Sequence, residues 1–520
     1  MPIVQQGSIN TTALVVPDLY VQIVPPQNLV LNGVPTNVIG MVGTAAWGPV
    51  GQPVVVGTMA DYARIFGSVM PRRFDMGTQV ATAVQQGAQA FRCVRVTDGT
   101  DTAAQVQLTA STFTFTALYT GALGSQIVLA LTPGSAANSW RLTVSLPGLA
   151  PEVFDNVAGT GAAFWAALAA AVNTGIGPQR GPSQLVVANA NGATNAVAAF
   201  TTTLGAGTPG SDGASGVNAA TLVGSDTAPR TGMYALRGQG CSIGLLADSD
   251  DPSQWTTQAG FGLSEGVYMI IAGPAGDTIN AAVAMKRAVG LDSYAAKLMF
   301  GDWLWWSDQA NGSVRLVSPQ GFVAGRLANL SPEQSSLNKP LYGVIGSQKS
   351  GSPGSGQSAS YSSAELAALL GAGIDLIANP QPAGSFWGVR GGHNSSSNAA
   401  TSGDNYTRLT NYIAATLAAG MGQYVGQVIN ADLFRRVRAT QLSFLQNMMS
   451  QGLLGSTDGT LPFNVICDTS NNPNSRTNLG YVQSDAQVRY QAINEKFIVN
   501  MEGGQTVQVS RQTLPTGQPA

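Results

Sequence analysis

Two consecutive stretches, NVIGMVG (residues 37–43) and TMADYARIFG (residues 58–67), decide the fold of this chain. The first is a short, nearly continuous apolar run, which is typical of a buried strand. The second predicts a helix: Thr58 can cap its first turn, Asp61 stands three residues later, and Gly67 supplies a stop. A buried strand followed by a capped helix favours an α/β core.

The same alternation continues downstream and resumes later in the chain. Strand-like and helix-like runs of this kind are DMGTQVATAVQQG (75–87), AFRCVRV (90–96), SIGLLAD (242–248), VYMIIAG (267–273) and DTINAAVAMKRAVG (277–290). Residues 101 to about 235 differ, because Thr, Ala, Gly and Ser dominate and runs such as STFTFTAL alternate as strands do. One Ala-rich helix, AAFWAALAAAV, interrupts them.

We therefore predict an α/β (α+β) discontinuous core domain with an inserted, mostly-β domain and extended terminal β arms. The expected units are an N-terminal arm (1–27), the first part of the core (28–100), the β-rich insertion (101–235), the second part of the core (236–480) and the C-terminal strands and arm (481–520).

The second part of the core ends in helices. A linker-like stretch (346–360) precedes SSAELAALLG, where Ser362 and Glu365 form a capping box. NYTRLTNYIAATLAAG and ADLFRRVRATQLSFLQNMMSQG predict two longer helices. The apolar stripe of the last helix is Leu433, Phe434, Val437, Phe444, Leu445 and Met448. Arg435 lies opposite this stripe and Arg436 and Arg438 flank it, as a solvated face or as a contact surface for an acidic partner.

The chain begins and ends with short strand-like runs. In LYVQIV, Leu19, Val21 and Ile23 alternate with other residues, and prolines on both sides suit an edge strand or an added strand. In KFIVNMEGGQTVQVSR (496–511), two alternating runs flank Gly503-Gly504, as in a hairpin. Their apolar residues are Phe497, Val499 and Met501 in the first run, and Val507 and Val509 in the second.

A two-residue turn at these glycines would put the two apolar rows on opposite faces. A three-residue loop would put them on one face, and pairing of the last strand with another element is the other solution. An isolated hairpin is marginal in water in either case, so this segment requires a host sheet.

Composition restricts the possible functions. Charged residues make up 10% of the 520-residue chain, against about 25% in ordinary soluble domains. A protein surface with so few charges suits burial against partners, or alternatively a secreted β-rich protein with a hydroxyl-rich surface.

The net charge of −2 indicates no nucleic-acid footprint. No apolar run approaches the roughly 18 residues of a membrane span, and MPIVQQGSIN does not resemble a signal peptide. Three scattered cysteines favour a reducing cytoplasm.

The candidate catalytic and ligand-binding motifs lack the flanking elements or partner residues that their chemistry requires. GLSEG places Ser264 in a G-x-S-x-G pattern, but the strand follows the serine instead of preceding it, and His393 is the sole histidine. GSQKSG and GTGAAF do not meet the requirements of phosphate-binding loops. Asp248, Asp250 and Asp251 lack the glycine and distal glutamate of a calcium loop, so we expect Asp251 to cap a helix. We expect no catalytic residue, no metal and no cofactor.

Aromatic side chains concentrate in GDWLWWSD. Trp303 and Trp305 would share one face of a strand, with Trp306 on the other. A core or subunit interface is favoured over a stacking platform for sugars or bases.

Several stretches, in order along the chain, resemble the tail sheath proteins of contractile phage tails and related injection machines. They are GTAAWGPVGQPVVVGTMADYARIFG, QQGAQAFRCVRV, ALYTGALGSQIVLAL, GDWLWW…VSPQGFVAGRLA, FWGVRGG and RATQLSFLQNMMSQGLLG…FNVICDTSNNP. Gly391 replaces the family's usual Thr, and Ser318 and Gln320 depart from its "PPSG" run.

The resemblance implies a non-enzymatic structural subunit that polymerises as stacked hexameric rings around a tail tube. It also implies contraction that drives the tube through the host envelope, and arms that add strands to neighbouring subunits. The partners would be the chain itself, the tube protein, and baseplate and neck proteins, without nucleic acid or membrane insertion. The particle would be a virion tail assembled in the host cytoplasm. We expect the eight apolar arm residues to carry the inter-subunit sheet and Arg435, Arg436 and Arg438 to face the tube. A secreted, glycan-binding adhesin and a Ser264–His393 hydrolase are the alternatives.

Overall fold

The computed structural model describes residues 3–6, 20–23, 31–108 and 111–506. Its centre is a six-stranded sheet in which all neighbouring strands are parallel except β4 and β5. The strand order is β15 (Ala296–Met299), β14 (Tyr268–Ala272), β13 (Ile243–Leu246), β3 (Ile39–Gly43), β5 (Phe91–Arg95) and β4 (Pro53–Val56). Residues from two distant parts of the sequence thus share one sheet.

Helices cover both faces of this sheet, which confirms the predicted α/β class. Alternate strand residues point to opposite cores: Ile39 and Met41 contribute to one, and Val38 and Val42 to the other. The first core contains α1 (Met59–Phe66), α2 (Met76–Gln85) and α7 (Gln320–Ala328). The second contains α4 (Ala219–Val223), α5 (Trp255–Glu265), α6 (Ile279–Val289) and α8 (Ser363–Gly371).

The predicted helix starts are confirmed. Thr58 and Asp61 form the capping box of α1, and Ser362 and Glu365 form that of α8. The side chain of Asp75 accepts a hydrogen bond from the Thr78 backbone N–H and so caps α2. Each cap satisfies backbone donors that have no partner inside the helix.

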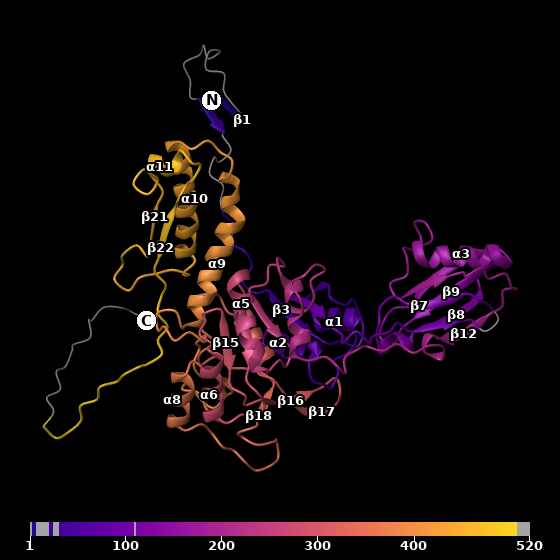
Figure 1. Ribbon diagram of the computed structural model, residues 1–520, viewed down its shortest axis with the longest axis horizontal. Coiled ribbons are helices and arrows are strands. Elements are labelled where there is room, and N and C mark those ends of the chain that lie inside the picture. Colours follow the sequence, from indigo (N-terminus) through magenta and orange to yellow (C-terminus); the bar gives the residue numbers. More distant parts are fainter. Residues whose placement is uncertain (1–2, 7–19, 24–30, 109–110, 507–520) are drawn as a thin grey trace.

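Residues 101–217 build two further sheets around a core of their own. The first has the order β10 (Glu152–Ala158), β9 (Ser139–Ser145), β8 (Val128–Pro133), β12 (Phe200–Thr203), and the second β11 (Val186–Asn189), β7 (Thr114–Ala117), β6 (Gln105–Gln107). The Ala-rich helix is α3 (Gly161–Thr174), which buries Phe164, Trp165 and Leu168 against the sheets. This unit lies at one end of the molecule (Figure 1).

Small sheets extend the second half of the core. They are β17 (Ser313–Val317), β16 (Leu304–Asp308) and β18 (Val344–Ser347), and the pair β19 (Ile377–Ala378) and β20 (Gly388–Val389).

A helical lobe occupies the other end of the molecule (Figure 1). It consists of α9 (Asp404–Met421), α10 (Ala431–Ser450), α11 (Asn474–Thr477) and a two-stranded antiparallel sheet of β21 (Phe463–Ile466) and β22 (Asp485–Val488). All six residues of the apolar stripe predicted on α10 are buried. They divide between the lobe's two small cores: Phe444, Leu445 and Met448 lie in one, and Leu433, Phe434 and Val437 lie in the other.

Candidate assembly site

The β21–β22 sheet has two strands, and among the described residues no third strand pairs with either of its edges. The Arg489 backbone N–H donates to the Pro462 carbonyl at 2.7 Å, in register with the pair. Hydrogen-bonded pairs alternate along an antiparallel ladder, so Phe463 and Val465 on β21, and Ala486 and Val488 on β22, direct their backbone groups outward. Unpaired edge groups of this kind are a template for another strand.

The two edges are not equivalent. On the β21 side, Arg438 Nε of α10 donates to the Val465 carbonyl oxygen at 3.0 Å. This carbonyl is one of the outward groups, so a charged side chain already occupies that edge. On the β22 side, the neighbouring Arg489 points to Asp458 instead, at 3.7 Å.

A groove of about 610 Å³ runs beside the outer edge of β22. Its walls are α9 and β22, and its lining residues are Ala400, Tyr406, Thr410, Ile413, Ala414, Leu417, Ala486, Val488 and Tyr490. Ala486 and Val488 share the face of β22 that looks onto the helices, opposite the buried Phe463 and Val465 of β21. A strand added here would find backbone partners at the edge and a largely apolar floor on α9.

The C-terminal segment after β22 is extended and exposed. Phe497, Val499 and Met501 are 82%, 71% and 88% exposed, and residues 491–503 form no helix or strand. The first run forms no strand within the single chain, because a lone extended run has no sheet to pair with. Its pairing with a sheet of another chain stays a prediction. Val507 and Val509, the apolar residues of the second run, lie outside the described residues.

This segment runs along the core and away from β22. The Asn405 side-chain amide donates to the Gln491 carbonyl at 2.9 Å, and His393 Nε2 lies 2.7 Å from Glu495 Oε1. The apolar run begins two residues after that contact. A chain anchored in this way presents residues 497–501 to solvent and not to its own β22 edge.

The N-terminal strand exists, but it pairs within the chain. Val21 and Ile23 belong to β2 (Tyr20–Ile23), which is parallel to β1 (Ile3–Gln6). Leu19 lies outside the described residues. A pairing with a neighbouring subunit remains a prediction for this arm.

A buried charge cluster fixes α9, and with it the groove, to the central sheet. Lys297 on β15 places its Nζ 2.6 Å from Asp375 Oδ2 and 2.9 Å from Asp404 Oδ1, at the first residue of α9. Tyr268 OH donates to Asp404 Oδ1 at 2.6 Å. Burial opposes ionisation of Asp404, but the Lys297 charge and hydrogen bonds from Ser336 and Tyr268 lower its pKa to about 2.

The three arginines of α10 have different surroundings. Arg435 is largely exposed and pairs with Asp432, and Arg436 lies 3.0 Å from the same carboxylate and also donates to Gln427. Arg438 binds the β21 edge as described. The three arginines thus differ in their partners: Arg435 and Arg436 share Asp432, whereas Arg438, which is also exposed, contacts β21.

The residues considered for hydrolysis have unrelated partners. Ser264 lies near the end of α5, and its Oγ donates to the Phe261 carbonyl at 3.0 Å. His393 contacts Glu495. No hydrogen bond joins the two among the described residues, so they form no nucleophile–base pair.

The three aspartates that are clustered in the sequence each have a different hydrogen-bond partner in the structure. Asp248 accepts from Gln79, Asp250 pairs with Arg73, and Asp251 accepts from the Ser253 N–H at 2.9 Å, which confirms its predicted capping role. Within the described ranges, no group of three or more His, Cys, Asp or Glu side chains could hold a metal ion. In the same part of the chain, no helix has the length and apolarity that a membrane crossing requires.

The tryptophans belong mainly to the interior. Trp303 and Trp306 are both buried, and their indole N–H groups donate to the Gly273 carbonyl and to Gln85 Oε1. Trp305 is half-buried on β16. The favoured core role is correct for Trp303 and Trp306. Trp303 precedes β16 and so does not share a strand face with Trp305 as expected, whereas Trp305 and Trp306 alternate along the strand.

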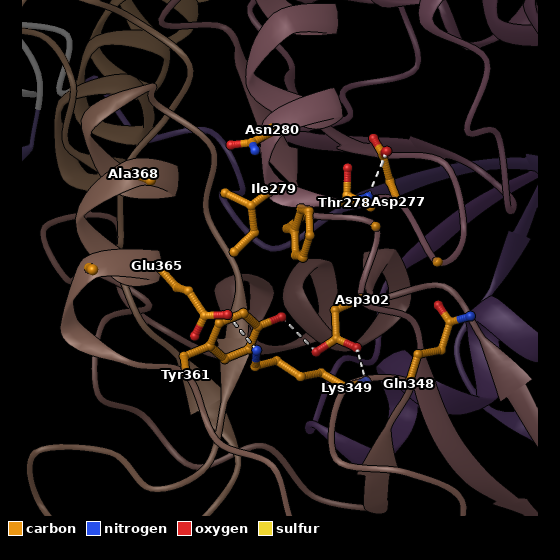
Figure 2. Close-up of a pocket in the computed structure, with 14 residues that line it drawn as sticks. Asp277, Thr278, Ile279, Asn280, Asp302, Gln348, Lys349, Tyr361, Glu365 and Ala368 are labelled. Carbon is orange, nitrogen blue, oxygen red and sulfur yellow. Dashed lines mark hydrogen bonds and ion pairs between the residues drawn. The ribbon is translucent and has the colours of Figure 1, made fainter.

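Figure 2 shows a cavity of about 640 Å³ beyond the carboxyl ends of β14 and β15. Lys349 Nζ lies 2.7 Å from Glu365 Oε1, and Tyr361 OH donates to Asp302 at 2.8 Å. The polar groups that could hold a ligand thus pair with one another. Their contacts attach the predicted linker to α8 and the core.

Sequence reasoning missed the β22 edge, the groove and the Lys297 cluster. VQSDAQVR shows little apolar alternation, and a lysine inside an apolar strand gives no sign of its partners, which are 78 and 107 residues away.

No protein-family model and no curated protein matches the sequence. Solved structures do match. A sheath tail protein of Listeria innocua is 13% identical with a TM-score of 0.59, covering 85% of this chain and 90% of its own. A sheath tail protein of Desulfitobacterium hafniense is 14% identical with a TM-score of 0.55, covering 85% and 92%. The contracted sheath of an extracellular contractile injection system, PVC, is 12% identical with a TM-score of 0.54, covering 95% and 99%.

The chain therefore has the fold of contractile sheath proteins. The likeness extends to sheath tail proteins and to an injection-system sheath over most of each chain, and it confirms at the level of fold the resemblance seen in the sequence.

Proposed function

We propose that this protein is the non-enzymatic, structural subunit of a contractile tail sheath. The observation that carries the proposal is the match between an unpaired sheet edge and an unpaired strand. The outer edge of β22 has free backbone groups above the groove, and residues 497–501 are apolar, exposed and without a sheet in their own chain. Adding the arm of one copy to the edge of another satisfies both.

The finer assembly follows from the fold likeness and the shape of the chain. Subunits would form six-fold rings stacked helically around a tail tube, with contraction driving the tube into the host. Further contacts would join the baseplate and neck of a tail particle assembled in the host cytoplasm. The insertion and the helical lobe lie at opposite ends of the molecule, which suits an insertion facing outward and a lobe facing the tube (Figure 1).

We also propose that the core, the insertion and the helical lobe are structural domains. Two boundaries differ from the units expected from the sequence: the insertion ends near residue 217, because α4 packs in the second core, and β22 belongs to the lobe, because it pairs with β21. Support comes from the separate hydrophobic cores of the central sheet, the insertion and the helical lobe. The terminal arms would then act as tethers while these units move as rigid bodies during contraction.

Substituting Ala486 with proline tests the receiving edge. The Ala486 N–H points outward and serves no bond within the β21–β22 ladder, so Ala486→Pro should fold with a melting temperature close to that of the wild type. The missing donor and the ring at the edge should prevent strand addition and hence tube formation, measured by sedimentation and electron microscopy. Ala486→Val, which keeps the N–H, is the matched control. Normal tubes from the proline variant would contradict this receiving edge.

Charge reversal tests the tube contact. Arg435 and Arg436 project from α10 with a single acidic neighbour, Asp432, and we propose that they face the tube. Arg435→Glu with Arg436→Glu should weaken co-sedimentation with tail tubes at least about tenfold while self-assembly without a tube persists. Arg64→Glu, at another exposed arginine on α1, is the control. Unchanged tube binding by the double variant would remove these residues from the interface.

A further inference from the structure

The two edges of the β21–β22 sheet differ in whether a side chain already occupies an outward backbone carbonyl. An added strand needs the outward carbonyls and N–H groups of the edge that it joins. At β21, the Val465 carbonyl already accepts a hydrogen bond from Arg438 Nε. At β22, the corresponding groups of Ala486 and Val488 border the groove over α9.

We propose that Arg438 is an edge cap that keeps β21 closed in the free subunit. The first strand from a second copy then adds at β22, and β21 accepts a strand after the guanidinium has left the Val465 carbonyl. Charged side chains at sheet edges are a recognised means of preventing unwanted strand pairing. This inference rests on the proposed function, because it concerns the sheet that receives the arms.

The surroundings of Arg438 favour this role over a tube contact. Its neighbours on α10, Arg435 and Arg436, turn to Asp432, whereas Arg438 turns to β21. Hydrogen bonds from Ser470 and, more weakly, the Arg438 charge lower the pKa of Asp468, two residues beyond the end of β21. The hydrogen bond to the Val465 carbonyl therefore holds the guanidinium at this edge, and the negative charge of Asp468 favours its position.

The occupant is an arm of a second copy and not the chain's own tail. Asn405 and His393 hold the segment after β22 against the core at Gln491 and Glu495. A return of that segment to its own sheet would break both contacts. An arm from a neighbour requires no such change.

Hydrogen exchange during assembly of the purified full-length chain, resolved to single amides, tests the order. In the wild type, the amides of Ala486 and Val488 should gain protection before those of Phe463 and Val465. Arg438→Met keeps the aliphatic stem and removes the donor, so both edges should become protected together and tubes should nucleate about five- to tenfold faster. Arg64→Met, at an exposed arginine on α1, removes a guanidinium elsewhere and should behave as the wild type.

Two results would overturn the inference, and they are distinguishable. Simultaneous protection of both edges in the wild type, with Arg438→Met unchanged, would show that Arg438 does not guard β21 although the arms still add. Tubes in which neither edge gains protection would refute strand addition itself, and with it the role of the sheet in the proposed function.

Discussion

Deleting residues 496–520 is expected to give a folded subunit that no longer forms tubes. The described part of this segment makes few contacts with its own chain, since Phe497, Val499 and Met501 are 71–88% exposed, and Glu495, which contacts His393, is retained. In the polymer these side chains would be buried, at about 1.5–3 kcal/mol each. After the cost of ordering the arm, their loss should raise the concentration needed for assembly at least about 100-fold.

Circular dichroism and thermal melting report on folding of the truncated chain, and sedimentation with electron microscopy reports on assembly. A shorter deletion of residues 512–520, which keeps both alternating runs, is the matched control and should assemble. A second variant, with Phe497, Val499 and Met501 all changed to serine, keeps the length of the arm and should fail to assemble. Normal tubes from either the long deletion or the serine variant would refute the role of the arm.

Replacing Lys297 with methionine is expected to destabilise the core by about 3–5 kcal/mol, because it leaves the Asp375 and Asp404 carboxylates buried without their cation. The cluster joins the central sheet to the start of α9, so we also expect the helical lobe to lose its fixed position. Chemical denaturation measures the loss of stability. Lys349→Met, at the more exposed pair with Glu365, should cost at most about 1 kcal/mol.

The destabilisation caused by Lys297→Met should depend on pH, because Lys297 sets the direction in which the pKa of Asp404 is shifted. In the wild type, the lowered pKa of Asp404 stabilises the fold above the unfolded-state pKa of about 3.9, and this contribution is lost as the pH falls towards 2. Without Lys297, burial would instead raise the pKa of Asp404, so protonation of this carboxyl relieves the unpaired charge. The destabilisation should therefore be largest near pH 8 and smaller at pH 5. A constant difference across this range would show that the charges are not its cause.

The parts of the fold that could be predicted are those governed by local rules. Capping at Thr58 and Ser362 marked helix starts, and the six-residue stripe of α10 marked its buried face. Continuous apolar runs marked the strands of the central sheet. These signals depend on residues a few positions apart, which a sequence displays directly.

The assembly site depends on distant residues and was predicted only in part. The exposed C-terminal run signalled a missing partner, but β22 carries little hydrophobic alternation and its partner β21 is about twenty residues away. Arg438 was read from its helical position as a tube contact, whereas its reach to Val465 is set by the packing of β21 on α10. The arm strands at 497–501 could not form in one chain, because their pairing groups are expected on another.

The most direct test of the account is cryo-electron microscopy of tubes grown from the purified full-length chain. The account predicts that the β21–β22 sheet gains a strand from an arm of a neighbouring subunit, beginning at the outer edge of β22 over the α9 groove. Tubes in which this sheet stays two-stranded, with both arms of every subunit free of their neighbours, would contradict it.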